Sequence, residues 1–189
     1  PDHPTATSGL LYELMLDRRN PTLASGVTVR PQLGSLSHEG IETDAEGNVY
    51  VIDEESRGAI YRFVPARYGD LSAGQLYALR VLNGAKTGPA EWVALDMNQV
   101  QVSARVAATA VAATPFCRPE DLERIGRTLY AALTCEDVDN PANLGGVGAV
   151  LAVELGDDPE VSYVVAAGRN APVENQALGL TGFSRVDNL

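Results

Sequence analysis

Three acidic residues recur at one place in a repeated sequence motif. The string Phe116–Leu122 returns with substitutions as Phe183–Leu189, and Ser37–Ile41 is a looser third copy. A repeat at this scale indicates supersecondary units stacked in an array. If the units surround a common axis, their acids converge on one centre, which is tolerated mainly where a cation neutralises them. The sequence therefore predicts a metal site with three carboxylate ligands: Glu39, Glu120 and Asp187.

Further oxygen ligands are expected beside the first two of these acids. Turn residues at 44–48 separate two apolar segments, and the resulting hairpin would bring Glu39 close to the acids at 53–55. The same geometry would surround Glu120 with a second group: Thr134, Glu136, Asp137 and Asp139. Hard cations such as calcium bind six to eight oxygens from carboxylates, carbonyls and water. The alternative is that these loop acids form only a solvated rim.

Three arginines could bind an anion. Arg118 and Arg185 stand in the repeated motif two residues before its acid, and Arg62 lies in an aromatic-rich apolar segment. A guanidinium group matches two phosphate oxygens at once. A single arginine is more often part of a surface ion pair, so the two in register with the acids are the better candidates. His38 directly precedes Glu39 and could ligate a metal or hold that acid in place.

The two cysteines, Cys117 and Cys135, lie at almost equal distances on either side of Gly126. If Gly126 forms the turn of a hairpin, they face each other across its strands, and cross-strand cysteines can meet disulfide geometry. An exported protein would oxidise such a pair. Two free buried thiols and a metal thiolate are the alternatives.

Length and composition set the class of protein. The 189 residues are 45% apolar, which is enough for one domain with a substantial core. The net charge of −11 argues against nucleic acid as a partner. No apolar stretch approaches the roughly 20 residues that are needed to span a bilayer, so we expect no transmembrane segment.

The apolar segments form two successive four-stranded antiparallel units. A strand is expected at 10–16, and the first unit follows it with strands at 41–43, 49–52, 59–64 and 76–81. The second unit repeats this order with strands at 122–125, 128–133, 149–155 and 161–167. Units of this size are typical of the blades of a β-propeller.

One segment departs from the strand pattern. Gln101–Ala113 is rich in alanine and contains neither glycine nor proline, which predicts a short helix. Val102 and Val106, with Thr109, would fall on one face of it. We expect this helix to pack between blades.

Several short motifs, taken in chain order, resemble the PhoX-type alkaline phosphatases: Gly9–Leu14, Ser37–Gly40, Val49–Glu54, Tyr61–Pro65, Phe116–Glu120 and Asp187–Leu189. The ordered string is more specific than any one motif. It implies an all-β fold, a six-bladed β-propeller of which residues 1–189 would carry about two to three blades, exported to the periplasm or the cell exterior. It also implies hydrolysis of phosphate monoesters at a central cluster of calcium and iron ions, faced by Glu39, Glu120 and Asp187.

Four places depart from the family pattern. Ile52 stands where threonine is usual, Asp121 where glycine is usual, and Val186 where proline is usual. Thr134–Asp137 resembles the family's cysteine-containing iron-binding motif but comes too late in the chain order. We interpret it as a similarity that arises because the blades repeat each other in sequence. The chain would then carry the middle of such a protein without its full metal set, or belong to a relative that lost it.

Two functions of different classes follow. The first is a metal-dependent phosphomonoesterase that uses calcium, with iron as a second candidate, on a small phosphate ester. The second is a non-catalytic, calcium-stabilised propeller that serves as a binding or surface-structural module, because propellers host both. A lactonase-like metal propeller is a third option. Since the third repeat ends at Leu189, we expect a fragment whose blade faces are covered by the rest of the propeller or by a partner chain.

Overall fold

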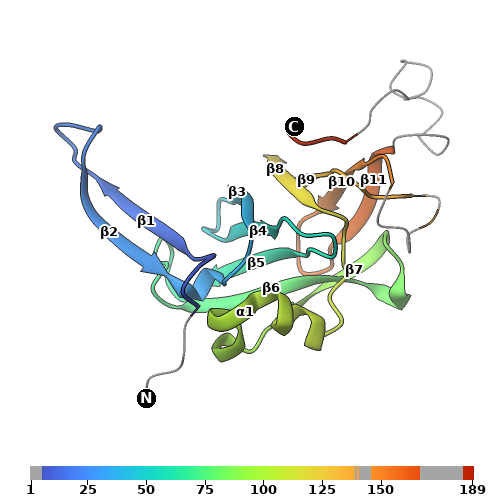
Figure 1. Cartoon of the computed structure of the whole chain (residues 1–189), viewed down its shortest axis with the longest axis horizontal. Coiled ribbons are helices and arrows are strands. Elements are labelled where there is room, and N and C mark those ends of the chain that lie inside the picture. The colour runs from blue at the N-terminus through green and yellow to red at the C-terminus, as the bar shows by residue number, and fades with distance from the viewer. Residues whose placement is uncertain (1–5, 139, 141–145, 167–184) are drawn as a thin grey trace.

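The computed structural model describes residues 6–138, 140, 146–166 and 185–189, and it is an all-β partial propeller with one α-helix (Figure 1). Its strands are β1 Leu11–Leu16, β2 Ala24–Arg30, β3 His38–Thr43, β4 Val49–Asp53, β5 Ile60–Pro65, β6 Gly74–Val81, β7 Gly88–Ala94, β8 Pro119–Ile125, β9 Thr128–Leu133, β10 Ala149–Glu154 and β11 Glu160–Ala166. The helical segments are η1 Pro31–Leu33, η2 Leu82–Gly84 and α1 Met97–Ala110.

Two antiparallel blades make up most of the fold. The first consists of β3 to β6 in sequence order and the second of β8 to β11, as the sequence predicts. The sequence pattern does not predict β7, because it begins with the turn signal Gly88-Pro89. This strand pairs with β6 at five positions and with β11 at two, so it joins both blades into one nine-stranded sheet.

The two ends of this sheet meet, because β3 and β8 pack side by side. Gly40 of β3 lies against the backbone of β8, where a Cβ atom would be 2.4 Å from the Leu122 nitrogen. Any larger residue would force the strands apart. The acid-bearing strands of both blades therefore lie next to each other.

The larger hydrophobic core fills the space between the blades. Tyr50 and Ile60 of the first blade meet Leu133 and Leu151 of the second, and Phe116 enters from the connection between the blades. All five side chains are almost completely buried. This packing sets the blades relative to each other and so places the loops at their ends.

A second core lies on the other face of the first blade, where α1 and η1 cover it (Figure 1). Val49 and Val51 of β4 point to this side, which is why every residue of β4 is buried. The helix contributes Val100, Ala104 and Ala107. The prediction that the helix packs between the blades is therefore wrong.

The bounds and the buried face of α1 also differ from the prediction. The helix begins four residues earlier, at Met97, because Asp96 caps it and accepts a hydrogen bond from the Asn98 amide at 2.9 Å. Its backbone is non-helical at Ser103, which shifts the faces of the two halves. Val102 and Val106 are consequently 39% and 54% exposed. None of the described helices is long and apolar enough to cross a membrane.

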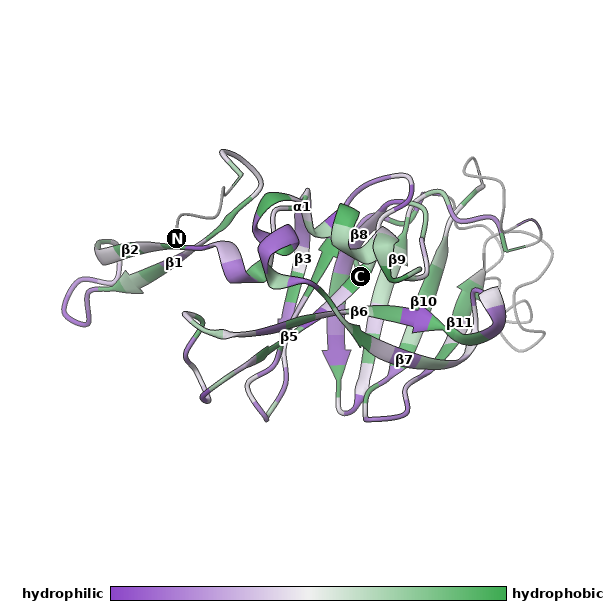
Figure 2. Cartoon of the chain, turned by 90° about the horizontal axis from the view of Figure 1, so that it is seen from below, coloured by the Kyte–Doolittle hydropathy of each residue, from purple (hydrophilic) through white to green (hydrophobic). Residues whose placement is uncertain are grey.

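The β1–β2 hairpin projects from the blades (Figure 1). The sequence predicts β1 but not β2, whose segment 24–30 contains serine, glycine and arginine. Tyr12 and Leu14 pair with Val29 and Val27, and all four side chains are exposed. Figure 2 shows the hydrophobic colouring of this arm, whose apolar face has no neighbour among the described residues.

Candidate functional site

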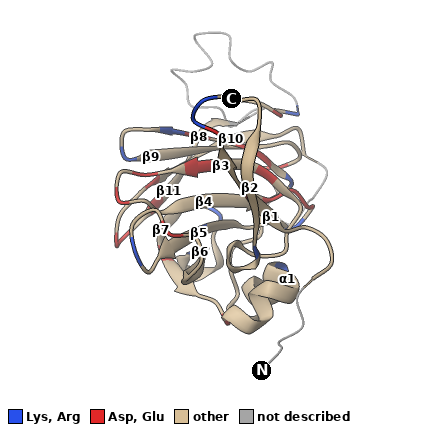
Figure 3. Ribbon diagram, turned by 90° about the vertical axis from the view of Figure 1, so that its left-hand side faces the viewer, with Lys and Arg blue, Asp and Glu red and all other residues tan. Residues whose placement is uncertain are grey.

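Glu39 and Glu120 occupy equivalent β-bulges at the same end of the two blades. On the first blade the register shifts between His38 and Ile41, and on the second it shifts in the same way between Pro119 and Leu122. In each blade, two residues of the bulged strand (β3 or β8) thus face one residue of the neighbouring strand (β4 or β9). Such a bulge changes the direction of a side chain and is common beside active sites. Figure 3 shows acidic positions on β3 and at strand ends around it. We call this end of the blades the acidic rim.

Arg118 is the cation of the acidic rim that contacts an acid of each blade. Its Nε lies 2.5 Å from Glu54 Oε1 and its Nη2 lies 3.0 Å from Glu120 Oε1, so it links the two blades. Its backbone is left-handed, with φ of 48°, and its amide donates to the Glu55 carbonyl oxygen at 2.9 Å. An arginine rarely adopts this conformation, and such strain is found preferentially at functional sites.

Glu120 is the most enclosed of the three repeated acids. It is 8% exposed, and its Oε1 also accepts a hydrogen bond from the Thr134 hydroxyl at 2.6 Å. Burial raises the pKa of Glu120, helped by the nearby charges of Glu54 and Asp187 and opposed by Thr134 and Arg118. The carboxyl group therefore keeps its proton to a higher pH than an ordinary glutamate.

The C-terminal residues bring the third copy of the motif to the same rim. Arg185 has a φ of 56°, close to that of Arg118, and its amide donates to the Val147 carbonyl oxygen at 2.7 Å. Thr134 can also donate to the Val186 carbonyl oxygen at 3.0 Å. Asp187 acts electrostatically on both Arg118 and Glu120. The rest of this copy, 183–184, lies outside the described residues.

Asp121, which stands where the family has glycine, holds this segment in place. Its Oδ2 accepts a hydrogen bond from the Leu189 amide at 3.0 Å. The equivalent residue of the first blade is Gly40, which must be small because it touches the backbone of β8. Gly40 thus allows close packing of β3 against β8, whereas Asp121 binds the C-terminal segment.

A second ion pair fixes the rim of the first blade. Asp53 is fully buried and accepts two hydrogen bonds from Arg105 of α1, at 2.6 and 2.8 Å, and one from the Ser37 amide at 3.0 Å. Arg105 also lies 3.3 Å from Glu55. The sequence analysis missed this arginine, although its position as the one basic residue of α1 was a usable signal.

Glu136 is buried on the rim of the second blade and is fully paired. Lys86 lies 2.9 Å away, the Cys117 amide donates to it at 2.8 Å, and the Tyr163 hydroxyl donates at 3.2 Å. Lys86 also donates to the carbonyl oxygen of Pro115. These bonds hold the segment before Arg118 from both sides. Lys86 was not predicted, because its loop carries no recognisable motif.

Cys117 and Cys135 form a disulfide with a Cα–Cα distance of 5.2 Å. The bond lies directly beside Arg118 and Glu136 in the chain, and Cys117 is buried whereas Cys135 is half-buried. It ties the entry of β8 to the exit of β9, so the loop that carries Arg118 is fixed covalently as well as by hydrogen bonds.

The rim acids are oxygen donors of the kind that hard cations prefer, but they do not form a cation site on their own. Glu39 is exposed, and His38 Nε2 lies 3.1 Å from the Gly34 carbonyl oxygen rather than on Glu39. Burial lowers the pKa of His38, which favours its neutral form. Arg118 already contacts both Glu54 and Glu120. In the described part of the chain, no three His, Cys, Asp or Glu side chains lie close enough to hold a metal ion.

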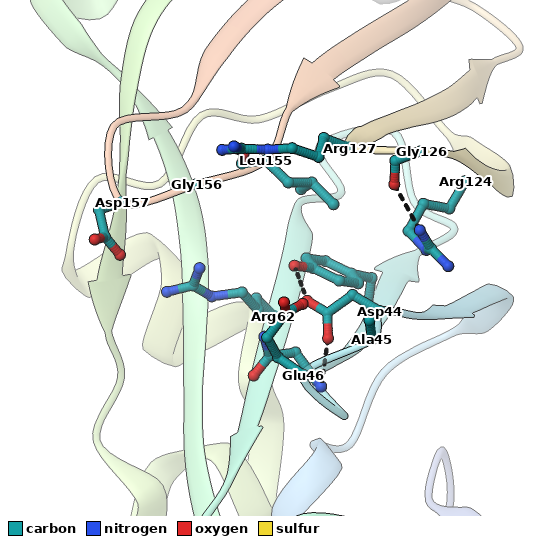
Figure 4. A pocket seen from close by; sticks show the side chains of 12 residues that line it. Asp44, Ala45, Glu46, Arg62, Arg124, Gly126, Arg127, Leu155, Gly156 and Asp157 are labelled. Carbon is teal, nitrogen blue, oxygen red and sulfur yellow. Dashed lines mark hydrogen bonds between the residues drawn. The ribbon is translucent and has the colours of Figure 1, made fainter.

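Arg62 is not at the rim. It lies on β5 beside Tyr50 and lines a pocket formed by the turns at the opposite end of the strands (Figure 4). Of the three arginines that the sequence suggests as anion ligands, Arg118 and Arg185 share the rim, and Arg62 belongs to another site.

Residues 9–177 match the model of the family described as alkaline phosphatase PhoX. A solved structure, Pseudomonas fluorescens PhoX in complex with vanadate, a transition state analogue, is 23% identical with a TM-score of 0.62. The match covers 79% of this chain and 35% of that one, so the chain spans about a third of that structure. No curated protein matches the chain.

Proposed function

The chain belongs to the PhoX alkaline phosphatase family, and on this basis we propose that it takes part in the hydrolysis of phosphate monoesters at the acidic rim. The family match over residues 9–177 is the observation that carries the proposal. The relative from Pseudomonas fluorescens binds vanadate as a transition state analogue. A group of the same shape and charge is the ligand that we expect at Arg118.

Arg118 would bind the phosphate of the substrate. Its planar guanidinium group can meet two phosphate oxygens, and the contacts with Glu54 and Glu120 hold it at the rim. A preorganised cation of this kind stabilises charge that develops in the transition state. Arg185, which has the same backbone conformation, is the second candidate.

Glu120 would supply a proton. Its raised pKa keeps the carboxyl group protonated to a higher pH, and Oε1 is already occupied by Thr134 and Arg118. In its protonated form the acid would carry the proton on Oε2 and could pass it to the oxygen of the leaving alcohol. A metal-bound Glu120 would be ionised, so the roles of general acid and metal ligand are alternatives for this residue. A carboxylic acid in this position acts as a general acid.

The family resemblance implies calcium, with iron as a second candidate, and Glu39, Glu120 and Asp187 remain the predicted ligands. Calcium needs six to eight oxygens, so further ligands would have to join these three. A bound cation would neutralise phosphate charge. Metal analysis of the purified full-length protein tests this assignment, and an absence of calcium and iron would contradict it.

An oxidising compartment, the periplasm or the cell exterior, suits the Cys117–Cys135 disulfide. Thiol labelling of the protein under denaturing, non-reducing conditions after rapid isolation from cells tests this. Labelling of both cysteines would contradict it.

We expect the rest of the propeller, or a partner chain, to pack against the exposed blade surfaces.

The Arg118 site can be tested by substitution. With p-nitrophenyl phosphate as substrate, Arg118→Met should lower kcat/KM of the full-length protein about 100-fold, the size of effect seen when one stabilising donor is removed. Arg118→Lys should recover only part of the loss, because lysine keeps the charge but lacks the planar fork. The matched control is Arg67→Met, in an exposed turn. Unchanged kcat/KM in a folded Arg118→Met variant would contradict the proposal.

A non-catalytic propeller is the second candidate function. The charge balance around Arg118 favours it, because Glu54 and Glu120 are already paired without any ligand. On that interpretation the cluster serves only to hold the blades together. Full-length protein that binds calcium but hydrolyses no aryl phosphate would favour this function.

A further inference from the structure

A cavity lies at the end of the strands opposite the acidic rim. The β3–β4, β8–β9 and β10–β11 turns surround it, and its volume is about 430 Å³ (Figure 4). Three arginines line it: Arg62 from β5, Arg124 from β8 and Arg127 from the β8–β9 turn. We call it the arginine pocket.

The arginines of this pocket have no acidic partners. In the part of the chain that the structure describes, none of the three forms an ion pair, although the sequence holds 25 acidic and only 14 basic residues. The carboxylates in the pocket wall are Asp44, Glu46 and Asp157.

Asp44 is already occupied by other groups. It accepts hydrogen bonds from the Asn48 amide at 2.8 Å, the Asn48 side chain at 2.7 Å and the Tyr50 hydroxyl at 2.9 Å. These bonds shape the β3–β4 turn. Glu46 is at the exposed tip of the same turn, and Asp157 is exposed on the β10–β11 turn.

Among the described residues, Arg124 and Arg127 donate hydrogen bonds only to carbonyl oxygens. Arg124 donates to the carbonyl oxygens of Thr43 at 2.6 Å and Gly126 at 2.5 Å, and Arg127 donates to that of Leu155 at 2.8 Å. Carbonyl oxygens orient a guanidinium group but do not neutralise its charge. Both side chains are thus oriented by carbonyl oxygens, without a described carboxylate within ion-pair distance.

Arg62 shows the clearest need for a ligand. Its guanidinium lies 5.1 Å from the ring centre of Trp92 and 5.5 Å from that of Tyr77. The Arg62 Nε is buried without a hydrogen-bond partner, although the guanidinium group also interacts with the Tyr50 hydroxyl. A buried donor without an acceptor is costly, and an oxyanion entering the pocket would provide acceptors.

We propose that the arginine pocket is an oxyanion-binding site for a small ligand with a phosphate or diphosphate group. Its volume falls within the range of small-molecule sites, and guanidinium groups bind phosphate oxygens bidentately. The site is separate from Arg118, and the proposal does not rest on the proposed function.

Methylenediphosphonate, a diphosphate analogue that a phosphatase does not hydrolyse at its P–C–P bridge, is the probe. Trp92, the single tryptophan of this chain, stacks on Arg62, so its fluorescence should change saturably during titration. A Trp92→Phe variant identifies its share of the signal, and calorimetry gives Kd independently.

Two variants locate the binding. Arg127→Ala, at an exposed position, should raise Kd about tenfold, because one charge-assisted contact is lost. Arg62→Lys should raise it by a similar factor while keeping the charge over Trp92. Arg67→Ala, in an exposed turn outside the pocket, should leave Kd unchanged.

The Arg118→Met variant separates the two sites. It should bind the diphosphonate at the arginine pocket with unchanged Kd and an unchanged response of Trp92. Three outcomes would overturn the proposal: no saturable binding to the wild-type protein, equal Kd in wild type and both pocket variants, or loss of the Trp92 response in Arg118→Met. The last would place the ligand at the rim.

Discussion

The two blades contain the same bulged strand pair but surround its acid differently. On the first blade Glu39 is exposed, whereas on the second Glu120 is buried, accepts a hydrogen bond from Thr134 and forms an ion pair with Arg118. The residue that corresponds to Thr134 in the first blade is Glu54, which itself pairs with Arg118. The repeat thus fixes the backbone position of the acid, while residues from other segments decide its charge and solvation.

The way in which each rim is held also differs. The second blade has a disulfide, a buried Lys86–Glu136 pair and a docked C-terminal segment. The first blade depends on Asp53, which Arg105 of the helix neutralises. Because of this difference, disruption of the second blade should cost stability and also displace Arg118.

Loss of Lys86 should have the largest effect. Lys86→Met leaves Glu136 buried without its cation, and breaking a buried pair costs about 3–5 kcal/mol. The side chains of Lys86 and Glu136 are 12% and 2% exposed, so water replaces little of the lost interaction. Urea unfolding of the variant measures the change in free energy.

The matched control is Arg80→Met. Arg80 pairs with Glu91 at 2.9 Å, but these side chains are 36% and 44% exposed, and an exposed pair contributes about 0–1 kcal/mol. Equal losses of stability in the two variants would mean that burial does not distinguish the pairs. The buried Lys86–Glu136 pair would then contribute no more to stability than the exposed Arg80–Glu91 pair.

Removal of the disulfide should have the next largest effect. The double variant Cys117→Ala/Cys135→Ala opens a loop of 18 residues, which costs about 3 kcal/mol in the chain-entropy model. Thermal unfolding under non-reducing conditions measures it. Reductant should lower the Tm of the wild type toward that of the variant, and a wild-type Tm that is insensitive to full reduction would contradict the expectation.

The sequence predicts the two blades well because their strands carry strong local signals. The turn chemistry at Asp44 and Gly126 and the apolar runs beside it are readable without tertiary information. β7 and β2 escape prediction because glycine, proline and serine weaken their pattern, and pairing with neighbouring strands overrides local preference. The face of α1 changes because of the non-helical Ser103, which no periodicity reveals.

The candidate site is predictable only in part, for a similar reason. The motif repeat brings Arg118, Glu120 and Asp187 to one rim, and Arg118 and Arg185 share a left-handed backbone conformation. The partners Arg105 and Lys86 come from a helix and a loop far away in sequence, so no motif links them to the rim. Arg62 shows the converse, since a residue within a family motif lies at the other end of the blade.

The smallest predicted effect concerns the pH dependence of stability. Burial raises the pKa of Glu120 above 4.5 in the folded state, so the folded protein binds this proton more tightly than the unfolded chain does. The stability that this proton provides is fully present below the unfolded pKa and is lost as pH rises through the folded pKa. Glutamine is neutral throughout, so Glu120→Gln should not show this loss.

The difference in unfolding free energy between the wild type and Glu120→Gln should therefore change in favour of the variant as pH rises from below 4.5 toward neutrality. Urea unfolding at several pH values measures it, and Glu39→Gln is the matched control, because Glu39 occupies the same bulge but is exposed. If both variants give the same pH profile, the two acids have the same environment in solution. Equivalent backbone positions would then mean equivalent chemistry, contrary to the comparison of the blades.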